Sequence, residues 1–374
     1  MKELQTILTE SARLKAENVR AVLATVVDVK GSGYRLPGAK MLIAESGEIF
    51  GTVSGGCLES DVLEQARKVL ETGEPTILTY DTTANRESVF SLNMGCNGVT
   101  RILLEAAENN KYFEFVESCF QAETSGVVAT LIAGNGETCL KIGARYFFSN
   151  EQEISSDLPV DFKESLSADV SDLLAAGGRS HCRTFETEES ATAEFFLELV
   201  APPQNLLVFG AGYDAIPVVN FARNLGWKIT IVDHRAAFAA RTRFPGADRI
   251  VLTQPENLAE NLSIGKNAAA VVMTHNYEKD REILQFLLGQ KSLAYVGALG
   301  PKSRTEKLLE ELREQLDEDF SRFDLEKLFA PVGLDIGADN PEAIALSIIA
   351  EIQSVLGNRA GGFLRARQGS IYGR

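Results

Sequence analysis

The sequence predicts an α/β protein in which an internally duplicated α/β region precedes a Rossmann-like, doubly wound parallel sheet. Two observations predict this fold class. Segments in the N-terminal half repeat at a spacing of 105 residues, as between Ala24 and Ala129. In the rest of the chain, apolar strand-like segments alternate with amphipathic helical segments. The length of 374 residues, with 45% hydrophobic and 24% charged residues, suits a globular protein of two or three domains.

An internal repeat organises the predicted N-terminal domain, residues 1–203. Residues 21–43 resemble residues 126–148, so we expect two related halves, at about residues 18–107 and 124–200. The alternative is a chance similarity between two segments that each form a strand, a turn and a strand. The matching pairs include Ala24 and Ala129, Thr25 and Thr130, Gly31 and Gly136, and Gly38 and Gly143.

Hydrophobic periodicity assigns the elements of the first half. Apolar residues at helical spacing predict one helix at the N-terminus and another that ends at Gly73. Runs rich in β-branched residues predict the strands. In chain order, we expect a helix at residues 3–18, strands at 20–29, 39–44 and 49–53, a helix at 57–72, and strands near 75–80 and 99–105.

A Rossmann-like domain is predicted at residues 204–358, after a proline pair in the segment APPQ (201–204). A strand, a glycine turn, a helix and a second strand cover residues 204–235, and further strands alternate with helices after them. These later strands are expected at 249–252, 268–274 and 293–298, and the later helices at 278–290 and 302–316.

The Rossmann-like domain begins with a dinucleotide-binding pattern. Gly210 and Gly212 belong to a G-x-G-x-x-A sequence after a strand, and Asp233 ends the next strand, where an acid can bond a ribose hydroxyl. Asp214 opposes this interpretation, because a carboxylate at the helix N-terminus repels a pyrophosphate. Two interpretations stay open: the domain binds NAD(P) or another nucleotide, or it is a scaffold with a different ligand or none.

The carboxyl ends of the later strands supply further candidates, because ligands of open α/β sheets bind there. His275 is a candidate catalytic proton donor, although a loop histidine bonded to the backbone is an equally good interpretation. Gly297 ends the next strand, and Lys302 begins a helix whose N-terminus favours an anion. These residues would serve an NAD(P)-dependent oxidoreductase, which is the alternative function.

Cys57 is the first candidate reactive thiol. The segment VSGGCLESDV (53–62) places it after Gly55 and Gly56, at the start of a predicted helix. The glycines permit a tight turn and a close approach of a ligand to the backbone, and a helix N-terminus favours a thiolate. This position suits a nucleophile, a persulfide carrier or a ligand of a soft metal.

Cys96 is the second candidate thiol, in the glycine-rich segment LNMGCNG (92–98) with Gly95 and Gly98. The second half of the repeat lacks both cysteine motifs, which favours a functional role over a scaffold role. Each cysteine alone also fits a small buried apolar residue. The two thiols could flank one pocket, with Arg35 as a contact for an anion.

Charge and composition argue against several functions. A net charge of −15 opposes nucleic-acid binding, although residues 359–374 form a basic tail with four arginines. No apolar run approaches the roughly 18–20 residues of a membrane span, and the N-terminus lacks the apolar segment of a signal peptide. We therefore expect a cytoplasmic protein without a membrane span.

Six motifs run in one order along nearly the whole chain: GSGYRLPGAKM (31–41), VSGGCLE (53–59), LNMGCNG (92–98), VFGAGYDAIP (208–217), VMTHNYEKD (272–280) and PVGLDIGADNPEAIALSIIAEI (331–352). This series resembles the xanthine dehydrogenase accessory factors of the XdhC/CoxI family. The family's glycine–cysteine motifs map onto Gly55, Gly56, Cys57, Gly95, Cys96 and Gly98, and its Rossmann motif maps onto Gly210, Gly212 and Asp233.

The resemblance implies a maturation factor rather than a metabolic enzyme. Such proteins bind the molybdenum cofactor (molybdopterin), keep it while a cysteine desulfurase supplies its terminal sulfur, and deliver it to a xanthine dehydrogenase-type molybdenum hydroxylase. Cys57 and Cys96 are then candidate molybdenum contacts. We also expect a homodimer, because such assemblies are common.

Overall fold

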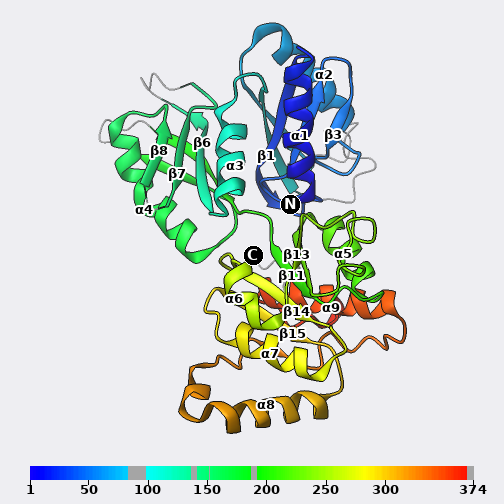
Figure 1. Cartoon of the computed structure of the whole chain (residues 1–374). Helices are drawn as coiled ribbons and strands as arrows, with labels where there is room; N and C mark the ends of the chain where they lie inside the picture. Colours follow the sequence, from blue (N-terminus) through cyan, green and yellow to red (C-terminus); the bar gives the residue numbers. More distant parts are fainter. Residues whose placement is uncertain (83–97, 136–140, 151, 187–191, 369–374) are drawn as a thin grey trace. The chain divides into compact units, whose positions relative to one another are not determined.

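The computed structural model divides into two units, Lys2–Pro202 and Pro203–Arg374, each of which is described by itself (Figure 1). Among the helices of the described residues, none is long and apolar enough to cross a membrane. The structure describes residues 1–82, 98–135, 141–150, 152–186 and 192–368.

Two five-stranded antiparallel sheets form the N-terminal unit. Their strand orders are β3-β2-β1-β5-β4 and β8-β7-β6-β10-β9. The first sheet contains β1 (Ala21–Gly31), β2 (Lys40–Ala44), β3 (Ile49–Gly51), β4 (Thr76–Asp81) and β5 (Gly98–Ala106); the second contains β6 (Gly126–Gly134), β7 (Arg145–Ser149), β8 (Gln152–Ser156), β9 (His181–Glu186) and β10 (Thr192–Val200).

The two sheets repeat each other in register as well as in order. Thr25 of β1 pairs with Leu103 of β5, and Thr130 of β6 pairs with Phe196 of β10, so that the β1 and β6 partners again lie 105 residues apart. Both pairings are also interrupted by a β-bulge, which lies beside Asp28 in the first sheet and beside Glu194 in the second.

In the described part of this unit, four helices cover the faces of the sheets. They are α1 (Lys2–Ala16), α2 (Glu59–Thr72), α3 (Lys111–Ala122) and α4 (Val160–Ala176). The apolar stripe of α2 packs on the first sheet through Val62 and Ala66, and α4 packs on the second through Leu166 and Val170. Helices α1 and α3 share a different core cluster with the two sheets.

Buried ion pairs connect the two halves across their boundary. Lys40 of β2 lies with its Nζ 2.7 Å from Oε1 of Glu198 on β10, and Arg145 of β7 pairs with Glu105 of β5. These side chains are 3% to 10% exposed. Tyr112 of α3 donates a hydrogen bond from its hydroxyl to Glu198 at 3.0 Å, so buried charges and a buried hydroxyl join the halves.

The C-terminal unit is a six-stranded parallel sheet with the order β13-β12-β11-β14-β15-β16. Its strands are β11 (Asn205–Phe209), β12 (Lys228–Asp233), β13 (Arg249–Leu252), β14 (Ala268–Val272), β15 (Leu293–Ala298) and β16 (Leu328–Phe329). This order is the doubly wound arrangement of a Rossmann fold. With the two antiparallel sheets of the other unit, it confirms the predicted fold class.

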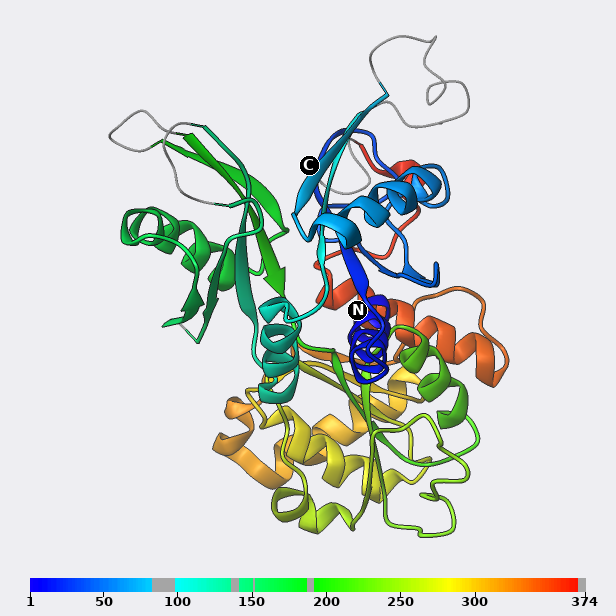
Figure 2. The same cartoon turned by 90° about the horizontal axis from the view of Figure 1, so that it is seen from above.

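Helices cover both faces of the parallel sheet. Helices α5 (Ala215–Asn224) and α9 (Pro341–Leu356) lie side by side and share one core cluster (Figures 1 and 2). Apolar residues of α6, α7 and α8 belong to a second cluster with the other face of the sheet. The remaining bounds are α6 (Leu258–Asn261), α7 (Tyr277–Leu288), α8 (Lys302–Leu316), η1 (Pro255–Asn257), η2 (Asp317–Arg322) and η3 (Leu364–Ala366).

Candidate functional site

The loop between β3 and α2, residues 52–58, carries the exposed thiol of Cys57. The helix begins at Glu59 with Leu58 as its N-cap, two residues later than the sequence predicted, so Cys57 precedes the cap. Gly55 and Gly56 have φ angles of 89° and 114°, a left-handed conformation that favours glycine. Of the three cysteines in the described part of the chain, Cys57 alone is exposed.

Glu59 holds this loop together with its carboxylate. Its Oε1 accepts hydrogen bonds from the Thr52 hydroxyl at 2.5 Å and from the Ser54 amide at 2.9 Å. Burial raises the pKa of Glu59, but the hydrogen bonds from Ser54 and Thr52 outweigh burial and bring the pKa down to about 2. The carboxylate also accepts from the Ser54 hydroxyl and from the amides of Gly55, Gly56 and Leu58.

Glu59 and the neighbouring Tyr34 belong to this candidate site and were missed by the sequence analysis. The Tyr34 ring lies against Gly55, where a Cβ would come within 2.5 Å of the ring, while the tyrosine stays 66% exposed. An acid in the first turn after a Ser-Gly-Gly segment is the available signal for Glu59, because such a loop offers several free amides. For Tyr34 the sequence offers no comparable signal.

Gly98 lies at the same end of the first sheet as the Cys57 loop. A Cβ on Gly98 would come within 2.8 Å of the Ser32 carbonyl, so the start of β5 needs a glycine to approach this turn. The turn that begins after β1 therefore contacts Gly98 through Ser32 and Gly55 through Tyr34. Cys96 and Gly95 lie outside the described residues, so their relation to Cys57 stays a prediction.

Arg35, the predicted anion contact, belongs to the same turn and is paired with a carboxylate. Its Nη2 lies 2.6 Å from Oε1 of Glu3 on α1, and the side chain is 27% exposed. An anionic ligand would therefore have to compete with Glu3 for this guanidinium.

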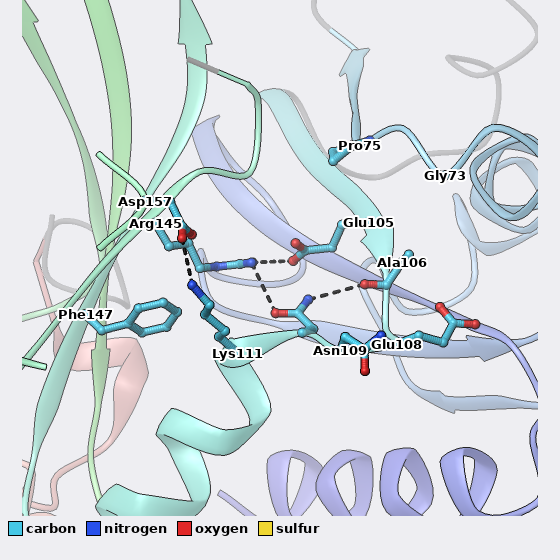
Figure 3. Close-up of a pocket in the computed structure, with 11 residues that line it drawn as sticks. Gly73, Pro75, Glu105, Ala106, Glu108, Asn109, Lys111, Arg145, Phe147 and Asp157 are labelled. Carbon is cyan, nitrogen blue, oxygen red and sulfur yellow. Dashed lines mark hydrogen bonds and ion pairs between the residues drawn. The ribbon is translucent and has the colours of Figure 1, made fainter. Parts of the chain in front are cut away.

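A cavity of about 250 Å³ in the same unit lies beside the Arg145–Glu105 ion pair (Figure 3). Figure 3 shows the Arg145 guanidinium directed toward Glu105. Nη1 of Arg145 also donates to Oδ1 of Asn110 at 3.2 Å. Carboxylates outnumber cations here, so this cavity does not favour an anion and we regard it as part of the boundary between the halves. Its charged residues are Glu105, Glu108, Asp157, Lys111 and Arg145.

The glycine turn of the Rossmann-like domain packs against the protein itself. Gly210 has a φ of 109°, and a Cβ there would lie 2.5 Å from the Met273 carbonyl. A Cβ on Gly212 would overlap Oδ1 of Asp214. Contacts within the domain therefore account for both glycines.

Asp233 ends β12, as predicted, and its side chain is 2% exposed. Its Oδ2 accepts from the Ala211 amide at 2.7 Å and from Nη2 of Arg235 at 2.7 Å, and Oδ1 accepts from the Arg235 amide at 2.8 Å. Burial raises the pKa of Asp233, but the bonds from Arg235 and Ala211 outweigh burial and bring it to about 2.

His275 pairs with Asp214 at the carboxyl end of the sheet. Its Nε2 lies 2.6 Å from Oδ2 of Asp214, with the histidine side chain 60% exposed and the aspartate side chain 18% exposed. His275 has a φ of 58°, a left-handed conformation that is uncommon outside glycine.

The other two candidates at the carboxyl ends of the strands, Lys302 and Gly297, have contacts with residues other than His275 and Asp214. Lys302 begins α8 and is 75% exposed, with Glu306 at 3.8 Å. A Cβ on Gly297 would lie 2.5 Å from Val332, so packing accounts for this glycine.

Comparisons with known proteins agree with the series of motifs along the chain. Residues 14–81 match the model of the XdhC and CoxI family, and residues 206–352 match that of the XdhC Rossmann domain.

Among curated proteins, the chain is 32% identical to a protein of Bacillus subtilis (strain 168) named as a probable xanthine dehydrogenase subunit, over 91% of this chain and 94% of that one. It is 22% identical to the "Molybdenum cofactor insertion chaperone PaoD" of Escherichia coli (strain K12), over 94% and 88% of the two chains. A crystal structure described as a xanthine dehydrogenase from Bacillus halodurans superposes with a TM-score of 0.74 at 29% identity, covering 96% of this chain and 98% of that one.

Proposed function

Because the chain belongs to the XdhC and CoxI family, we propose that it is a maturation factor that binds the molybdenum cofactor, holds it while its terminal sulfur is installed, and delivers it to a xanthine dehydrogenase-type molybdenum hydroxylase. The name of one relative, a molybdenum cofactor insertion chaperone, supports a role in the maturation of this cofactor. In this proposal a cysteine desulfurase supplies the sulfur and the protein acts as a homodimer.

The exposed Cys57 thiol on a fixed glycine loop is the observation that carries the proposal. The cofactor holds its molybdenum through soft dithiolene sulfurs, and a thiolate offers a further sulfur ligand of the same kind. Because the carboxylate of Glu59 fixes the backbone on both sides of Cys57, the thiol is presented without a large loop rearrangement. Fixed geometry reduces the entropy that binding costs.

Other residues near this loop suit the remaining parts of the cofactor. The ring of Tyr34, 66% exposed beside Gly55, offers an aromatic face to the pterin. Arg35 would exchange Glu3 for the cofactor's phosphate. Cys96, together with Gly95 and Gly98, is the second proposed contact.

Copurification tests this function. We expect the protein, coexpressed with the enzymes of cofactor synthesis, to carry molybdenum and pterin in equal amounts, measured by elemental analysis and by the fluorescence of the oxidised pterin. Protein from cells that lack cofactor synthesis is the control. A preparation without molybdenum or pterin above this control would contradict the proposal.

A further inference from the structure

A dinucleotide site in a Rossmann fold needs three features to be free. The glycine turn must be open to the backbone approach of the ligand, the helix N-terminus must receive the pyrophosphate, and the acid after the second strand must reach the ribose. In the C-terminal unit, each of these features is already engaged by groups of the protein.

The space over the second glycine of the turn is filled by a side chain of the protein. Gly210 packs against the Met273 carbonyl just after β14, as the first glycine of such a pattern does for its tight turn, whereas a Cβ on Gly212 would overlap Oδ1 of Asp214. In a dinucleotide site the pyrophosphate takes the position above this second glycine. The carboxylate of Asp214 therefore occupies the space that the fingerprint reserves for phosphate.

The N-terminus of α5 presents a negative charge to any ligand. Asp214 is the N-cap residue, yet its side chain does not cap the helix amides. Instead its Oδ2 lies 2.6 Å from Nε2 of His275, which follows β14. This contact joins two segments at the carboxyl end of the sheet and holds the carboxylate over the glycine turn.

The acid expected to bind the ribose is also engaged. Both oxygens of Asp233 accept hydrogen bonds from Arg235, and one also accepts from the Ala211 amide within the glycine turn. With its side chain 2% exposed and both oxygens bonded within the protein, Asp233 would have to give up one of these bonds to accept from a ribose. The bond from the Ala211 amide to Asp233 instead stabilises the glycine turn.

From these contacts we infer that Asp214, held by His275, excludes pyrophosphates, and with them NAD(H) and NADP(H), from the Rossmann crevice. The two glycines of the fingerprint make packing contacts within the domain, and the residues present do not fit a dinucleotide. This inference concerns the C-terminal unit and does not depend on the proposed cofactor role of Cys57.

The test compares the unaltered protein with Asp214→Ser, which removes the carboxylate and keeps a residue that suits a helix N-cap. Calorimetric titration with NADH and with NADPH measures affinity, and quenching of Trp227, the one tryptophan of the chain, reports binding within the same unit. We expect no saturable binding to the unaltered protein up to about 1 mM, and an affinity at least about tenfold higher for Asp214→Ser.

Glu310→Gln is the matched control, because it removes one negative charge from an exposed position on α8. It should behave as the unaltered protein does. Tight binding of either nucleotide to the unaltered protein would overturn the inference. Equal lack of binding by the unaltered protein and Asp214→Ser would also overturn it, because something other than Asp214 would then exclude the nucleotide.

Discussion

Glu59 is the residue on which the geometry of the Cys57 loop most depends. One carboxylate gathers amides and hydroxyls from both sides of the thiol, and its pKa of about 2 keeps it ionised at neutral pH. The exposed position of Cys57 therefore follows from the hydrogen bonds of its neighbours, Gly56 and Leu58.

Glu59→Gln should lower the free energy of unfolding by about 2 kcal/mol, because the amide group cannot accept for all of the loop donors that the carboxylate satisfies. The pKa of Glu59 is lowered from 4.5 to about 2, so its stabilisation is present above pH 4.5 and is lost as the pH falls toward 2. We therefore expect the stability of the variant to decline less over this range. Urea denaturation at a series of pH values measures both effects.

Glu64→Gln provides the matched control for this prediction. Glu64 lies on the same helix and is exposed, so its replacement should change the free energy of unfolding by less than about 0.5 kcal/mol. Equal stability and equal pH dependence of the two variants would show that the Glu59 carboxylate does not hold the loop.

Between elements, the two buried ion pairs are among the contacts that fix one half of the N-terminal unit against the other, together with the core cluster that α1 and α3 share with both sheets. Lys40 of β2 and Glu198 of β10 are both buried, and charges of this kind are costly when either loses its partner. The pairs Lys40–Glu198 and Arg145–Glu105 occupy matching places in the two repeats, which makes the boundary nearly symmetric.

Glu198→Gln should lower the free energy of unfolding by about 3–5 kcal/mol, because it leaves the Lys40 ammonium buried without a counter-charge. Asp157→Asn, which breaks the exposed Lys111–Asp157 pair, should cost less than about 1 kcal/mol. Urea denaturation measures both. Similar losses of unfolding free energy in the two variants would mean that burial does not determine how much these ion pairs contribute to stability.

The repeat was visible in the sequence because turn and packing residues recur at one spacing, as Gly38 and Gly143 do. The ion pairs between the halves were not visible in the sequence, because Lys40 and Glu198 lie 158 positions apart and no local pattern marks them as partners. The start of α2 was misplaced by two residues for a local reason: Gly55 and Gly56 adopt left-handed conformations that delay the helix.

For the whole molecule, the fold class followed from the alternation of strands and helices and from the repeat. The candidate sites were predicted from the sequence less completely than the fold class was. The sequence indicated Cys57, Asp214 and His275 as candidates. It did not indicate the contact of Asp214 with His275, which lies 61 positions away, because that contact depends on tertiary geometry. The same holds for the hydrogen bonds that the Glu59 side chain accepts from the preceding loop. The Rossmann fingerprint and the opposing carboxylate of Asp214 were recognisable in the sequence, whereas the hydrogen bonds that engage Asp233 were not.

Binding of the molybdenum cofactor by Cys57 is the central proposal for this molecule. Its most direct test is the ratio of molybdenum to protein in Cys57→Ala, purified after coexpression with cofactor synthesis, with Cys182→Ala as the control for loss of a less exposed thiol of the same unit. We predict a loss of at least about tenfold in bound molybdenum for Cys57→Ala, and full retention for the control. Equal retention by both variants would contradict the proposal.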